Sequence, residues 1–111
     1  MSDLVTTART SGTGSVLALA GELDLSTADR VRSALDALAL GPGWRLVLDL
    51  SGVTFCDSSG ITALVVAHNR ARAVNADLVL AGVPDHLVRM LRVVGLDQVF
   101  TTDSGADPRE A

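Results

Sequence analysis

Residues 45–66 read RLVLDLSGVTFCDSSGITALVV, and this stretch predicts a buried strand followed by a helix. The run at 45–50 is almost continuously apolar, which is typical of a central strand covered on both faces. Residues 51–56 then connect the strand to the helix. Asp57 or Ser58 can cap that helix, because either side chain can accept hydrogen bonds from its first backbone N–H groups.

The two serines of this stretch, Ser58 and Ser59, therefore lie at the positive end of a helix dipole, in a helix predicted to run from about Ser59 to Ala73. This position favours added negative charge, so a phosphate could be accommodated there without rebuilding the fold. The simpler interpretation is that residues 57–60 form only a helix cap followed by a permissive glycine. The local pattern alone leaves both interpretations open.

The N-terminal third predicts a hairpin and a helix. Strands at Leu4–Thr10 and Val16–Ala20 are joined by a glycine-containing turn at 11–14, so they should pair antiparallel. Ser26 is the expected N-cap of the first helix, which the glycines and proline of 41–43 end. One face of that helix is apolar and consists of Ala28, Val31, Ala34, Leu35 and Leu38.

The C-terminal third repeats the alternation of strand and helix. A buried strand is predicted at 77–82, and Pro84 opens a helix that Gly95 ends. Its inward face should consist of Leu87, Val88, Leu91 and Val94. A short last strand is expected at 99–101, and the polar tail at about 102–111 should fray.

These elements predict one α/β domain over residues 1–111. Strands connected through helices imply a mixed sheet of four to five strands with a parallel portion, flanked by three to four helices.

The charge of the chain disfavours several classes of partner. Nine basic residues, all arginine, oppose thirteen acidic ones, for a net charge of −4, and the arginines form no stripe. The basic surface of a nucleic-acid-binding protein is therefore absent. The start of the chain lacks a signal peptide and no apolar run has the length of a membrane span, so we expect a cytoplasmic protein with no membrane contact.

Metal, cofactor and enzyme sites find little support in the sequence. Cys56 is the only cysteine, and its apolar neighbours Val53 and Phe55 predict a buried, unreactive thiol. His68 is expected to be packed on its helix and His86 to face solvent, with no second ligand at metal-binding spacing. The chain lacks the Gly-x-Ser-x-Gly elbow, the dinucleotide loop and the P-loop, so we expect no cofactor and no catalytic residue.

Two blocks together carry a resemblance to a known family. They are Gly21-Glu22-Leu23-Asp24, before the first helix, and residues 48–60, LDLSGVTFCDSSG. The chain resembles a stand-alone STAS domain of the anti-sigma factor antagonist family, the small bacterial proteins that control a sigma factor by capturing its inhibitor. The order of elements agrees from Leu4 to Thr101, so the resemblance implies the STAS fold for nearly the whole chain.

The resemblance also implies a mechanism and its residues. An anti-sigma serine kinase would phosphorylate the second serine of the pair, Ser59, and the unphosphorylated form would bind that kinase and free the sigma factor. A metal-dependent serine phosphatase of the PP2C type would restore binding. Asp24, Asp57, Ser58 and Gly60 would contribute to the docking surface. The free protein is expected to be a monomer and a substrate of both enzymes, without catalytic activity of its own.

Two other functions remain open. The domain could be a structural subunit of a transport or signalling complex, in which phosphorylation is incidental. It could also bind a small ligand or a nucleotide through the same loop. Family members commonly end in a further helix, for which residues 102–111 are too short and too polar.

Overall fold

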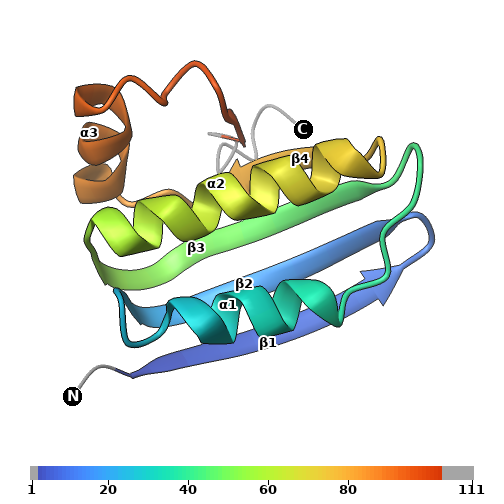
Figure 1. Ribbon diagram of the computed structural model, residues 1–111, viewed down its shortest axis with the longest axis horizontal. Coiled ribbons are helices and arrows are strands. Elements are labelled where there is room, and N and C mark those ends of the chain that lie inside the picture. Colours follow the sequence, from blue (N-terminus) through green and yellow to red (C-terminus); the bar gives the residue numbers. More distant parts are fainter. Residues whose placement is uncertain (1–2, 104–111) are drawn as a thin grey trace.

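The computed structural model describes residues 3–103, which form a five-stranded sheet and three helices (Figure 1). This confirms the predicted mixed α/β architecture. Helices α1 and α2 lie next to each other on one face of the sheet. In chain order the elements are β1 (Leu4–Ser11), β2 (Gly14–Leu23), α1 (Ala28–Asp36), β3 (Arg45–Cys56), α2 (Ser58–Ala73), β4 (Asp77–Ala81), α3 (Asp85–Val93) and β5 (Thr101–Asp103).

The strands lie in the same order in the sheet as in the sequence. β1 and β2 form the predicted antiparallel hairpin, while β2, β3, β4 and β5 are parallel to one another. A helix connects each parallel pair, as such connections require. The carboxyl ends of the parallel strands therefore meet at one edge of the sheet, which is on the left in Figure 1.

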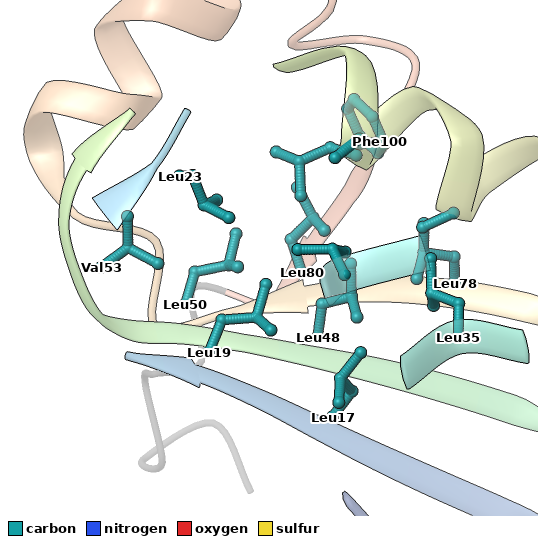
Figure 2. Close-up of a cluster of buried hydrophobic side chains, with 14 of the residues drawn as sticks. Leu17, Leu19, Leu23, Leu35, Leu48, Leu50, Val53, Leu78, Leu80 and Phe100 are labelled. Atoms are coloured by element: carbon teal, nitrogen blue, oxygen red, sulfur yellow. The ribbon is translucent and has the colours of Figure 1, made fainter. Parts of the chain in front are cut away.

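The core fills the space between the sheet and the helices, and it is almost entirely aliphatic. Figure 2 shows leucines of neighbouring strands directed into one cluster. On β3 the side chains alternate, because Leu46, Leu48 and Leu50 are fully buried whereas Val47 and Asp49 are only partly covered. The expectation that this strand is covered on both faces was wrong, since α1 and α2 lie on the same side.

β3 is longer than the sequence predicted. Residues 51–56, expected to be a connector, continue the strand because their pairing with β2 persists through two irregularities in register. Gly52 permits this close pairing, since a Cβ atom on it would lie 2.8 Å from the Cβ of Ala20. The strand thus reaches Cys56, which pairs with Leu23 immediately before α2 begins.

Three local expectations need correction. Thr27, not Ser26, occupies the N-cap position of α1, although its side chain accepts no hydrogen bond from the helix, and this helix already ends at Asp36. Val94 follows the end of α3 and is exposed, so it does not belong to the inward face of the helix. The last strand starts at Thr101 and includes 102–103, which were assigned to the tail, because these residues pair with β4. Residues 104–111 of the expected frayed tail lie outside the described residues.

Candidate functional site

Two loops meet at the edge where the parallel strands end. One joins β2 to α1 and carries Asp24, and the other joins β3 to α2 and carries Asp57. In Figure 1 both lie at the left end of the sheet. The backbone N–H of Asp57 donates to the carbonyl of Leu23 at 3.1 Å, which ties the two loops together. Parallel pairing of β2 with β3 therefore brings residues 21–24 and 48–60, which are far apart along the chain, to the same end of the sheet.

Asp57 is the N-cap of α2, as one of the two predicted alternatives proposed. Its backbone is extended, with φ −109° and ψ −169°. Its Oδ1 atom accepts hydrogen bonds from the backbone N–H groups of Ser59, at 2.8 Å, and Gly60, at 3.2 Å. The carbonyl of Asp57 accepts a hydrogen bond from the backbone N–H of Ile61. These three hydrogen bonds fix the residue at which α2 begins.

The hydroxyl groups of Ser58 and Ser59 are available for chemistry. Ser58 is exposed and Ser59 is partly exposed. Among the hydrogen bonds of residues 3–103, none involves the side-chain oxygen of either serine. A modifying enzyme therefore need not break a protein hydrogen bond to reach these hydroxyls.

The cap changes what a phosphate would meet at this helix terminus. The sequence suggested that this position favours added negative charge, but the backbone N–H groups of Ser59 and Gly60 already donate to Asp57. A phosphate on Ser59 would instead lie next to a carboxylate on the preceding turn. The two negative charges repel each other, so the phosphate is not neutralised by the cap.

Asp24 organises the second loop. Its Oδ1 atom accepts hydrogen bonds from the backbone N–H of Ser26, at 3.0 Å, and from the Ser26 hydroxyl, at 2.8 Å. Ser26 is thus part of this turn rather than a helix cap. The Asp24 side chain thus shapes the loop and adds a negative charge to this end of the sheet.

Thr27 is a buried residue of the site that the sequence analysis missed. Its hydroxyl donates to the carbonyl of Glu22 at 2.7 Å and accepts the backbone N–H of Asp24 at 3.0 Å. This side chain closes the β2–α1 loop on itself. The signal in the sequence was the spacing Asp-x-x-Thr before a helix, which offers such a closed turn as an alternative to a cap at Ser26.

The two loops carry negative charge only. Residues 21–27 and 51–62 contain the carboxylates of Glu22, Asp24 and Asp57 and no lysine or arginine. A partner that covers this end of the sheet therefore faces acidic groups, which a basic surface complements.

Gly60, predicted to be part of the docking surface, is buried at the start of α2. A Cβ atom on Gly60 would lie 2.6 Å from Sγ of Cys56, and 2.8 Å from both Cβ and the carbonyl oxygen of Leu23. Only glycine lets the helix begin this close to the ends of β2 and β3. Gly60 therefore determines how close the first turn of α2, which carries both serines, lies to the ends of β2 and β3.

The remaining candidate side chains are one cysteine and two histidines. Cys56 is buried as predicted, and burial, followed by the charge of Asp57, raises the pKa of its thiol to about 11. Phe55, in contrast, is exposed rather than buried beside it. His68 packs edge-on against Phe100, as expected for a packed histidine. His86 is half-buried rather than solvent-facing, with Nε2 3.4 Å from the carbonyl of Val53.

Within residues 3–103 no group of three or more His, Cys, Asp or Glu side chains could hold a metal ion. In the same part of the chain, no helix has the length and apolar character needed to cross a membrane.

Comparison with known proteins places the whole fold and both loops in one family. Residues 6–102 match the family model described as Mlab, STAS domain. The chain is 36% identical over 82 residues to an anti-sigma-B factor antagonist of Listeria monocytogenes, a match that covers 74% of this chain and 72% of the relative.

Solved structures agree in fold. An anti-sigma factor antagonist from Mycobacterium paratuberculosis superimposes with a TM-score of 0.71 at 28% identity, over 90% of this chain and 85% of the other. A sulfate transporter family protein from Wolinella succinogenes superimposes with a TM-score of 0.70 at 23% identity, over 82% of this chain and 77% of the other. The second likeness concerns the fold alone, so the architecture by itself does not separate regulators from transporter components.

Proposed function

This chain belongs to the STAS domain family, and on that premise we propose that it is an anti-sigma factor antagonist controlled by phosphorylation of Ser59. Its unphosphorylated form binds an anti-sigma factor with serine kinase activity and thereby releases a sigma factor. Phosphorylation of Ser59 ends that binding, and a metal-dependent serine phosphatase restores it. In this scheme the protein is a regulator and a substrate, and both enzymatic activities belong to its partners.

The observation that carries the proposal is the state of the Ser59 hydroxyl. It lies in the first turn of α2, is partly exposed, and has no hydrogen-bond partner among residues 3–103. The backbone around it is held by the Asp57 cap, so the acceptor is presented in a defined position. A kinase thus meets an available oxygen on a rigid element.

The chemical step requires little from this chain. The Ser59 oxygen attacks the γ-phosphorus of a kinase-bound ATP, the bond to the ADP leaving group breaks, and a base of the kinase takes the hydroxyl proton. In the dephosphorylation step, water bound by the phosphatase attacks the phosphorus of phosphorylated Ser59. The bond to the serine oxygen breaks, that oxygen takes up a proton, and inorganic phosphate is released. The carboxylates of this chain are not needed as catalysts in either step.

The switch acts through charge at an interface. A phosphate adds roughly −1.5 to −2 charges at neutral pH. At this end of the sheet it joins Glu22, Asp24 and Asp57, with no basic residue in the two loops to balance it. A partner packed over Ser59 would therefore have to cover a crowded group of negative charges. Binding is lost while the fold, which does not depend on the serine hydroxyl, is retained.

The decisive experiment is intact-mass measurement and phosphosite mapping on the protein isolated from its native host, alongside Ser58→Ala and Ser59→Ala. We expect one phosphate that disappears only in Ser59→Ala. Loss of the phosphate in Ser58→Ala alone would move the acceptor to the neighbouring, more exposed serine. No phosphate under growth or stress conditions would contradict the proposal and favour an interaction subunit in which residues 57–60 form a docking turn.

A further inference from the structure

Two large apolar side chains are exposed at the same end of the sheet as Ser59. Leu25 is 79% exposed and Phe55 is 50% exposed. Single exposed apolar residues are common on protein surfaces and need no explanation. These two differ because of where they lie. Leu25 is in the β2–α1 loop, and Phe55 is near the end of β3, just before the loop that leads to the serines.

Their positions follow from the pairing of β2 with β3. Phe55 pairs with Glu22, one position before the pair formed by Cys56 and Leu23. Leu25 follows two residues after Leu23, whose carbonyl binds the N–H of Asp57. Leu25 therefore lies within the β2–α1 loop, directly after Asp24, and Phe55 lies two residues before Asp57.

An irregularity in β3 exposes Phe55. Gly21 pairs with Val53, but the next residue of β2, Glu22, pairs with Phe55, so Thr54 is an extra residue in β3. Such a bulge redirects the side chains that follow it. As a result Val53 and Cys56 are both buried, while Phe55 is directed outward. The aromatic ring is thus kept out of a core that buries almost every other large apolar side chain of the strand.

We infer that Leu25 and Phe55 are the apolar anchors through which the anti-sigma factor is bound, an inference that rests on the function proposed above. The occupant we assign is a protein surface with apolar pockets rimmed by basic side chains. The pockets match Leu25 and Phe55, and the basic rim matches Glu22, Asp24 and Asp57. Both anchors lie at the end of the sheet where α2 begins, which is also where a phosphate on Ser59 would be added.

In this arrangement the apolar anchors provide binding affinity, and the phosphate on Ser59 controls whether binding occurs. Buried aromatic and aliphatic anchors commonly contribute most of the binding energy of an interface. The anchors carry no charge, so phosphorylation leaves them unchanged. The phosphate on Ser59 then acts by preventing the partner from closing over them, and removing an anchor weakens binding even when Ser59 is unmodified.

The test uses the full chain and the purified anti-sigma factor kinase of the source organism that phosphorylates it. Dissociation constants would be measured by calorimetry for Leu25→Ser, Phe55→Ser and the double variant. Val93→Ser is the matched control, because Val93 is an apolar residue that is 85% exposed at the last position of α3. The start of α3 lies near β3, because His86 contacts the carbonyl of Val53. Val93, at the other end of this nine-residue helix, lies about 12 Å from the helix start along its axis and therefore away from β3.

We expect at least about tenfold weaker binding for each anchor variant, a larger loss for the double variant, and a change of less than about twofold for Val93→Ser. Unchanged melting temperatures would show that the anchor variants remain folded. Two outcomes would overturn the inference when Ser59→Asp binds poorly, as the proposed function requires. In the first, the anchor variants bind as tightly as the wild type. In the second, Val93→Ser weakens binding as much as the anchor variants do. If wild type and Ser59→Asp bind alike, or no kinase binds the wild type, the proposed function fails and this inference fails with it.

Discussion

The carboxylate of Asp57 lies 2.8 Å from the backbone nitrogen of Ser59, so the proposed phosphoacceptor is held by the very side chain that would repel its phosphate. The same Oδ1 atom also accepts the N–H of Gly60. The cap thus has two effects. It fixes the helix start that presents the hydroxyl, and it removes N–H donors that could otherwise neutralise an added phosphate.

The first prediction separates the cap from its charge. Replacing Asp57 by Ala removes the acceptor for two backbone N–H groups, and we expect a loss of about 1 kcal/mol in the free energy of unfolding. Asp57→Asn should lose much less, because asparagine caps helices as well as aspartate does. Urea denaturation of both variants measures this difference.

Ser58→Ala serves as the control for the Asp57 variants, because the Ser58 hydroxyl has no partner among the described residues. Its stability should stay within about 0.5 kcal/mol of the wild type. An Asp57→Ala variant as stable as the wild type would contradict the assignment of Asp57 as the cap.

The second prediction concerns the switch. Ser59→Ala should fold normally and bind the anti-sigma factor kinase continuously, because the acceptor is absent. Ser59→Asp adds a negative charge next to Asp57 and at the same end of the sheet as Asp24, and we expect a loss on the order of 3 kcal/mol in binding, or about a hundredfold. Calorimetric titration of both variants measures the ratio of the two affinities.

Backbone amide spectra provide the structural control for the Ser59 variants. If the switch works by disruption of an interface, changes should be confined to residues around the β3–α2 turn. Changes spread over the whole sheet, or equal affinities of Ser59→Ala and Ser59→Asp, would contradict it.

The third prediction concerns Gly60. Alanine usually stabilises a helix relative to glycine by about 1 kcal/mol. At this position the added Cβ would approach Cys56 and Leu23 to within 2.8 Å or less, and the carbonyl of Leu23 belongs to a strand that cannot easily move. We therefore expect Gly60→Ala to lower the free energy of unfolding by about 1–3 kcal/mol.

Gly41→Ala is the matched control for Gly60→Ala. A Cβ on Gly41 would meet its nearest neighbour, Trp44, at an ordinary 3.5 Å. Chemical denaturation of the two variants should show a loss for Gly60→Ala only. A Gly60→Ala variant more stable than the wild type would mean that the helix start relaxes freely.

Much of this site could be predicted because its determinants are local. The apolar run at 45–50 and the cap residues at 57–60 are adjacent in the sequence, and together they define a strand, a turn and a helix. The exposure of Phe55 could not be predicted in this way. It depends on the register between β2 and β3, in which Thr54 is an extra residue. This register is set by pairing between distant segments and cannot be inferred from the residues next to Phe55.

The capping of α1 shows the same limit. Ser26 and Thr27 are both acceptable cap residues, and the choice depends on where the end of β2 lies. The Thr27 hydroxyl donates a hydrogen bond to the carbonyl of Glu22, and the N-cap position of α1 is therefore one residue later than the sequence suggested. The sequence also could not show that α1 and α2 lie on the same face of the sheet. The apolar run of β3 is compatible with helices on one face or on both.

The last prediction uses the thiol of Cys56, whose pKa is raised to about 11 mainly by burial and then by Asp57. The thiolate is the reactive form, so the folded protein should react very slowly with a disulfide reagent at about pH 8 and rapidly once unfolded by urea. The raised pKa also predicts how stability depends on pH. Below the thiol's unfolded pKa of 9.0 both states are protonated, and between that value and about 11 only the unfolded state loses its proton. The free energy of unfolding should therefore decrease across this range in the wild type, and the decrease should be smaller in Cys56→Ala, which has no thiol. Equal slopes in the two proteins, measured by urea denaturation at a series of pH values, would assign the pH dependence to other groups.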